Sequence, residues 1–235
     1  MPTEDFDIDR LAAYLHLTPQ KVTRLADRGK LPGRKVAGQW RFSRAEIHHW
    51  LEERIGLADE EELINVEGVL ERDRGPDEVE EIVLTDLLLP EAIAVPLAAK
   101  TRNAVIRSMV DLAAGTGYLW DPDKMADAIR EREDMQSTAM ENGIALLHAR
   151  RPLPTILGQA FMAFGRTSRG IPFGGGFGNL TDMYFLICSI DDRGHLRTLA
   201  RLARVLGSPD VLDALREAET SDAVQRVFAD AESNL

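Results

Sequence analysis

Apolar residues in the first thirty positions follow the spacing of two short helices. The first helix begins after a predicted N-cap at Asp7, and four apolar residues form its inner face: Ile8, Leu11, Ala12 and Leu15. A second helix is predicted to start at Thr18-Pro19, with the threonine as N-cap and the proline at the first helical position. Its inner face carries Val22 and Leu25, and Gly29 ends it. The pattern therefore predicts two adjacent amphipathic helices.

The next twenty-five residues change from the helical period to two short extended pieces and back. The extended pieces are residues 34–36 and 39–42, and Ala37-Gly38 joins them in a predicted turn. Ser43 caps a last helix, whose inner positions are Ile47, Trp50 and Leu51. Helix, turn, helix, hairpin and helix within sixty residues is the order of a winged helix-turn-helix.

From Leu84 onward, helical and strand-like patterns alternate. The predicted helices span 84–89, 101–115, 121–133, 194–206, 208–217 and 221–230. The predicted strands span 92–95, 143–147, 155–164 and 182–189. Such alternation predicts an α/β fold: a mixed β-sheet with helices packed on its faces, in a domain larger than the first.

Charge divides the chain into three segments, although its net charge is −11. Residues 19–44 hold eight Lys or Arg against one acid, whereas residues 56–81 hold eleven acids against two arginines. We therefore predict a basic domain at 1–55, an acidic linker at 56–81 and a second domain at 82–235. The linker could be a solvated tether, or it could fold against the basic domain and compete with a nucleic acid.

Three features favour a cytoplasmic location without membrane insertion. Residues 1–9 are acidic and lack the apolar run of a signal peptide. The longest apolar runs, such as 183–187, are far shorter than the ~20 residues of a membrane helix. The single cysteine, Cys188, cannot form an intrachain disulfide or a metal cluster. We predict no metal site and no cofactor.

The N-terminal segment resembles the excisionase-type, MerR-like winged helix-turn-helix family over residues 7–54. Three motifs carry the resemblance: Leu11-Ala12-Ala13-Tyr14-Leu15, Gly29-Lys30-Leu31-Pro32 and Gly38-Gln39-Trp40-Arg41-Phe42. The family places its second helix in the major groove of DNA and its wing on the backbone. The resemblance therefore implies base contacts from Gln20, Lys21, Thr23 and Arg24, and phosphate contacts from Arg28, Arg34, Lys35 and Arg41. The alternative is a small basic domain that binds protein.

Other polar and aromatic residues of this segment have simpler interpretations. Trp40 is expected to pack in the wing instead of stacking on a base. The histidines here, which are His16, His48 and His49, are expected at the surface.

The second domain resembles the fructose/mannitol and nitrogen-regulatory class of enzyme IIA domains over residues 84–231. One motif joins Arg132-Glu133 and Ser137-Thr138 to Asn142-Gly143 and a short apolar strand that ends at His148. Further matches are Ile171-Pro172-Phe173, the strand that reaches Cys188, and Gly194-His195-Leu196-Arg197-Thr198-Leu199.

By this resemblance, His148 accepts a phosphoryl group from the histidine phosphocarrier HPr, and Arg132 and His195 line the same site. A neutral imidazole is a nucleophile near pH 7, and an arginine offers a planar fork to phosphoryl oxygens. His195 stands in the first turn of an amphipathic helix, in line with its inner leucines, so it is expected to face inward at a positive helix end. The simpler alternative is a histidine that merely closes an apolar strand.

Two residues depart from the pattern of the family. Glu141 stands where the family usually has glycine, and Leu147 where it usually has proline. If the Glu141 carboxylate lay beside the phosphoryl group, it would repel that group, so a degenerate, non-phosphorylated sensor remains an alternative. The glycine-rich stretch 174–178 lacks the Lys and Ser/Thr of a phosphate-binding P-loop, and we predict a hairpin turn there.

Three functions are compatible with these residues. The first is a DNA-binding regulator that responds to phosphorylation of His148, and the second is a relay component that passes phosphate to a sugar permease. The third is an interaction module with an inactive site. The basic N-terminal domain favours the first function. Cys188 lies in an apolar strand and offers no exposed second acceptor, which argues against the second function. The oligomeric state does not follow from the sequence.

Overall fold

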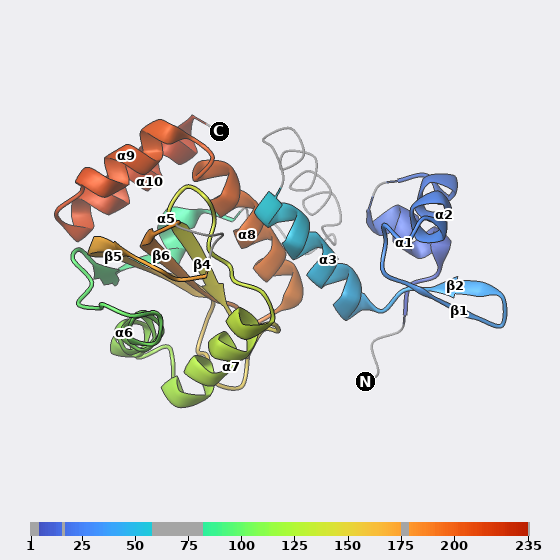
Figure 1. Cartoon of the computed structure of the whole chain (residues 1–235), viewed down its shortest axis with the longest axis horizontal. Coiled ribbons are helices and arrows are strands. Elements are labelled where there is room, and N and C mark those ends of the chain that lie inside the picture. The colour runs from blue at the N-terminus through green and yellow to red at the C-terminus, as the bar shows by residue number, and fades with distance from the viewer. Residues whose placement is uncertain (1–4, 16, 58–81, 175–178, 235) are drawn as a thin grey trace. The chain divides into compact units, whose positions relative to one another are not determined.

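A computed structural model describes residues 5–15, 17–57, 82–174 and 179–234. The chain divides into two compact units, Met1–Glu80 and Glu81–Leu235, which Figure 1 shows and which are described separately below. The predicted acidic linker lies almost entirely outside the described residues. The prediction that it folds against the basic domain concerns the same residues and stays a prediction. Every described helix is too short or too polar to cross a bilayer.

The first unit has the predicted order of a winged helix-turn-helix. Its elements are α1 (Ile8–Tyr14), α2 (Pro19–Asp27), β1 (Arg34–Val36), β2 (Gln39–Arg41) and α3 (Arg44–Leu57). The predicted N-caps of α1 and α2 are confirmed, because Asp7 accepts a bond from the Arg10 N–H at 2.8 Å and Thr18 accepts one from the Lys21 N–H at 3.3 Å. α3 continues two residues into the segment predicted as linker.

A small apolar core holds this unit together. Its fully buried side chains come from three helices and the wing, and they include Leu11, Val22, Phe42 and Ile47. The wing turns at Ala37 and Gly38, both of which have positive φ angles, as a tight two-residue hairpin requires. His48 was expected at the surface, which is wrong: it is 6% exposed, and its Nε2 lies 3.1 Å from the Tyr14 hydroxyl.

The second unit contains a four-stranded mixed sheet, as predicted. The strands are β3 (Leu88–Ala94), β4 (Ile144–His148), β5 (Phe161–Ile171) and β6 (Thr181–Cys188). They lie in the order β3-β5-β6-β4, in which β3 is parallel to β5, β5 antiparallel to β6, and β4 parallel to β6. The glycine-rich stretch therefore lies in the connection between two antiparallel strands, although residues 175–178 themselves are outside the described part.

Helices cover both faces of this sheet. They are α5 (Leu84–Leu87), α6 (Arg102–Gly115), α7 (Pro122–Met135), α8 (Asp192–Val205), α9 (Pro209–Glu217) and α10 (Ser221–Ser233). Figure 1 shows α6 and α7 on one side of the sheet and α8 to α10 on the other. The core under α6 and α7 includes Leu147 of β4 and Tyr184 of β6, both completely buried. This core fixes the strand that carries His148.

Two predicted strands are displaced in the structure. The strand predicted at 155–164 is β5, which begins only at Phe161. The earlier part, around Leu157, pairs instead with Leu119, and its glycine, Gly158, packs beneath Trp120. The strand predicted at 92–95 begins earlier, at Leu88, because Pro90 is tolerated in an edge strand whose pairing is irregular.

Candidate functional site

His148 lies at the C-terminal end of the edge strand β4, and its hydrogen bonds fix its tautomer. The side chain is 3% exposed, and Nδ1 lies 2.7 Å from the carbonyl oxygen of Leu146. A carbonyl can only accept, so Nδ1 carries the proton of the neutral ring. The lone pair is then on Nε2, which the Arg132 Nε–H approaches at 3.3 Å. The ring thus directs a nucleophilic nitrogen toward a fixed cation.

Arg132 is held in place from two directions. It stands in the last turn of α7, is 5% exposed, and donates through Nη1 to the carbonyl of Gln136 at 2.8 Å. Because that bond and the bond to His148 share one planar guanidinium, the group has little freedom to rotate. A guanidinium fixed in this way can bind the oxygens of a phosphoryl group on His148.

His195 approaches the same place from the opposite side of the sheet edge. It lies in the first turns of α8, is 3% exposed, and its ring centroid is 5.1 Å from that of His148. Its Nδ1 lies 2.9 Å from the Ser189 hydroxyl oxygen. The structure therefore brings together the three residues that the sequence indicated for a phosphoryl site, from α7, β4 and α8.

A second layer of bonds supports the loop between α7 and β4. The buried Glu133 carboxylate accepts from the Ser137 hydroxyl and from both the N–H and the hydroxyl of Thr138. Burial raises the pKa of Glu133, while the bonds from Thr138 and Ser137 and the charge of Arg102 counteract that rise. Glu133 thereby holds the segment that supplies the Gln136 carbonyl to Arg132. These residues belong to the sequence motif, but the sequence did not predict that Glu133 holds the loop between α7 and β4.

The structure corrects the expectation for Glu141. This residue lies in the tight turn before β4, where Gly143 has a positive φ and Met140 pairs with Ile144. His148 is at the other end of β4, four residue steps from Ile144, which is about 13 Å at ~3.3 Å per step. Glu141 is exposed there, so its carboxylate is not beside the phosphoryl position. Leu147 lies opposite Leu186 in the ladder between β4 and β6 and buries its side chain in the core.

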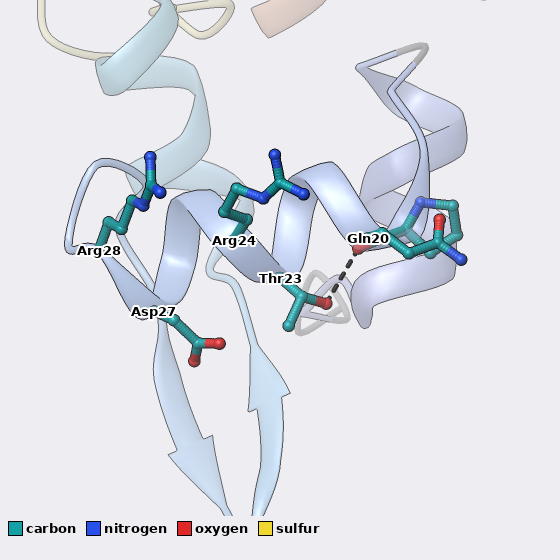
Figure 2. Close-up of a pocket in the computed structure, with 6 residues that line it drawn as sticks. Gln20, Thr23, Arg24, Asp27 and Arg28 are labelled. Carbon is teal, nitrogen blue, oxygen red and sulfur yellow. Dashed lines mark hydrogen bonds between the residues drawn. The ribbon is translucent and has the colours of Figure 1, made fainter.

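In the first unit, α2 presents the residues expected to read DNA bases. Gln20, Lys21 and Arg24 are exposed, and Figure 2 shows Gln20, Thr23, Arg24, Asp27 and Arg28 around one hollow beside this helix. The Thr23 hydroxyl donates to the Pro19 carbonyl at 2.9 Å, so its hydrogen is already engaged in the helix. Base contacts from α2 remain a prediction.

The cations expected on phosphates lie mainly in the wing, where acidic or polar groups already hold them. Arg34 pairs with Asp5 at 2.8 Å and Lys35 with Asp27 at 3.6 Å. Arg41 donates to the Trp40 carbonyl and to the Gln39 side chain, both at 3.1 Å. Arg28 is exposed at the end of α2. These exposed pairs are weak, at about 0–1 kcal/mol, and a DNA phosphate could displace them.

Asp27 is a functional candidate that the sequence did not single out. Its carboxylate on α2 accepts from the Trp40 Nε1–H at 3.3 Å and pairs with Lys35, so it joins the helix to the wing. Trp40 itself stacks on Phe42 with a centroid distance of 5.9 Å, which confirms the packing role expected for it. Only the fold brings Asp27 and Trp40 together, because thirteen residues separate them.

Comparisons with known proteins agree with the two units. Residues 86–231 match the family described as "Phosphoenolpyruvate-dependent sugar phosphotransferase system, EIIA 2", and residues 6–55 match "Helix-turn-helix domain". A "Nitrogen regulatory protein" of Bradyrhizobium diazoefficiens is 33% identical over 150 residues, which cover 62% of this chain and 94% of the relative. The fructose-specific EIIA component of Haloferax volcanii is 31% identical over 142 residues, 60% of this chain and 90% of the relative.

Solved structures share the fold of the second unit. The nitrogen regulatory protein IIA-Ntr from Neisseria meningitidis has a TM-score of 0.52 at 18% identity, covering 63% of this chain and 99% of that one. Enzyme IIAMtl from Escherichia coli, solved in complex with phosphorylated enzyme IIBMtl, has a TM-score of 0.53 at 19% identity, covering 61% of this chain and 99% of that one.

Proposed function

The chain belongs to the EIIA type 2 family of the phosphoenolpyruvate-dependent sugar phosphotransferase system, and we propose that it is a DNA-binding regulator phosphorylated on His148. The helix-turn-helix domain suggests DNA binding, and the enzyme IIA domain suggests phosphotransfer of the kind that this system performs. The observation that carries the proposal is the tautomer of His148, whose Nε2 lone pair faces Arg132.

The transfer step follows from that tautomer. The Nε2 lone pair of His148 gives up its hydrogen bond from the Arg132 Nε–H and forms a new N–P bond. At the same time the N–P bond to the donor imidazole breaks, and the donor nitrogen keeps the bonding electron pair. The Nδ1 proton of His148 stays on its bond to the Leu146 carbonyl, so the phosphorylated ring is a protonated, cationic phosphoimidazole. The charges balance when the donor phosphoimidazole is likewise protonated on its other ring nitrogen and leaves as a neutral imidazole. Transfer of this kind needs positioning and charge stabilisation more than covalent work from the protein. Arg132 supplies the charge, and we propose an HPr-type phosphohistidine as the donor.

The experiment that tests this proposal is a labelling reaction with the full chain. Phosphoenolpyruvate, the general phosphotransferase enzyme and HPr are added, and the product is analysed by mass spectrometry under conditions that preserve phosphohistidine. We expect one phosphoryl group, on His148. A chain that takes no label would favour the inactive interaction module.

A relay to a sugar permease is the second candidate, because relatives of this chain are named as fructose-specific components. Cys188 does not favour it as a further acceptor, since it is buried in β6 and burial raises the pKa of its thiol. Onward transfer of the label to a separate enzyme IIB protein would support the relay.

We propose that α2 and the wing bind duplex DNA. Substitutions of Arg24 and Arg28 separate a proposed base contact from a proposed phosphate contact. Arg24→Ala is expected to cost about 1–3 kcal/mol on a duplex recovered by random-sequence selection, and much less on a scrambled duplex. Arg28→Ala is expected to weaken both duplexes alike and to reduce the salt slope by about 1. Titrations of the full chain at several salt concentrations measure both effects. If both variants acted equally on the two duplexes, the base-reading part of Arg24 would be wrong.

A further inference from the structure

Ser189 connects the end of β6 to the site histidines. It follows Cys188 directly, is 8% exposed, and places its hydroxyl oxygen 2.9 Å from Nδ1 of His195. Its backbone is also held, because the Leu153 N–H donates to the Ser189 carbonyl at 3.1 Å. Ser189 is therefore held through both its side chain and its main chain. Its hydroxyl lies beside the ring of His195, whose centroid is 5.1 Å from that of His148.

The direction of the hydrogen bond between Ser189 and His195 follows because the proton of a buried hydroxyl requires an acceptor. A serine hydroxyl can donate or accept, and so can a neutral imidazole nitrogen. Within the described ranges, His195 Nδ1 is the one hydrogen-bond partner of the Ser189 hydroxyl. A buried hydroxyl whose proton finds no acceptor is unfavourable, because it loses its hydrogen bond to water without a replacement. Donation from Ser189 to Nδ1 avoids that cost, and the proton of the neutral His195 ring is then on Nε2.

We infer that Ser189 is a positioning residue that holds His195 as the Nε2–H tautomer, opposite to the tautomer of His148. The inference rests on the proposed phosphorylation of His148 for its function. A backbone carbonyl fixes His148 with a lone pair on Nε2, whereas a hydroxyl fixes His195 with a hydrogen on Nε2. One ring thus supplies the nucleophile, and its neighbour supplies a neutral donor for a phosphoryl oxygen.

Unlike a carbonyl, the Ser189 hydroxyl can also reverse its bond. If His195 takes up a second proton beside a bound phosphoryl group, Nδ1–H can donate to the same oxygen without moving the ring. Alanine at this position would remove both arrangements, while threonine would retain the hydroxyl. The pair of substitutions therefore separates the hydroxyl from the space that it fills.

Nitrogen-15 NMR of the unphosphorylated full chain tests the tautomer directly. The chain has five histidines, and the signals of His195 are assigned by their loss in His195→Asn. We expect wild type and Ser189→Thr to show a protonated Nε2 and an unprotonated Nδ1. Ser189→Ala is expected to shift His195 toward a mixture of tautomers. A proton on Nδ1 in the wild type, or unchanged shifts in Ser189→Ala, would overturn the inference.

The labelling rate gives an independent readout of the same variants. Partners that orient a metal-ligating histidine typically change affinity or activity 10–100-fold, and by analogy we expect Ser189→Ala to slow labelling of His148 about tenfold. Ser189→Thr should restore the rate, and Ser108→Ala in the middle of α6 should leave it unchanged. If Ser189→Thr labelled as slowly as Ser189→Ala, the proposed role of the hydroxyl would be wrong. A wild type with the expected tautomer but no label would refute the proposed phosphorylation and leave the tautomer assignment intact.

Discussion

Replacing His148 with alanine is expected to abolish phosphorylation of the chain. The imidazole Nε2 is the proposed nucleophile. Arg132 also donates to the Gln136 carbonyl oxygen, but an amide oxygen is a poor nucleophile. His195→Ala should slow labelling without abolishing it, because His195 is proposed to stabilise the phosphoryl group and not to bond to it. Labelling from phosphoenolpyruvate through HPr measures both variants. Label that persists in His148→Ala would show that the site is elsewhere.

Replacing Arg132 with glutamine is expected to have the next largest effect. Removing one preorganised donor to a developing negative charge typically costs about 10²–10³ in rate. Arg132→Gln should therefore slow single-turnover labelling of His148 by that factor. Arg132→Lys should recover only part of the rate, because an ammonium lacks the planar fork that reaches both His148 and the Gln136 carbonyl.

Arg130→Gln is the matched control for Arg132. Arg130 stands two residues earlier in the same helix, pairs with Asp127 at the surface, and makes no contact with His148. Its substitution should leave the rate unchanged. Because Arg132 is buried, thermal unfolding of each variant is compared with that of wild type. If Arg132→Gln unfolds, the labelling rate of Arg132→Lys is compared with that of Arg130→Gln to test the proposed role of Arg132. Equal rates in those two variants would contradict the assignment of Arg132.

The sequence predicted most of the fold because its local signals agree with the tertiary structure. Asp7 and Thr18 cap helices through bonds three residues away, which a sequence pattern can specify. The α/β character of the second unit likewise follows from the alternation of helical and strand periods. The strand at 155–164 was misplaced, because apolar residues around Leu157 pair with Leu119 outside the main sheet. Periodicity identifies an apolar segment but not its partner.

The candidate site was predicted in part, for the same reason. Arg132, His148 and His195 belong to motifs, and their side chains do meet. The expectation for Glu141 was wrong, because closeness in sequence to His148 becomes a full strand length in space. Ser189 and Asp27 were missed, because each acquires its part only through contact with a residue that the fold brings near.

Coupling between the two units is the remaining step of the proposed regulation. A phosphoryl group on His148 can change DNA affinity only by stabilising one arrangement of the chain more than another. Typical couplings are 1–3 kcal/mol, which corresponds to about 5–150-fold in affinity. The acidic segment 56–81 joins the units and adds charge between the basic domain and the phosphorylated one. The sign of the change depends on which arrangement the phosphate favours.

Titration of one selected DNA duplex with the phosphorylated and the unphosphorylated full chain tests the account most directly. We expect the two dissociation constants to differ within the range of about 5–150-fold. His148→Ala, treated with the same phosphorylating mixture, should keep the affinity of the unphosphorylated chain. Identical affinities for the fully phosphorylated and unphosphorylated wild type would contradict the proposal that His148 regulates DNA binding.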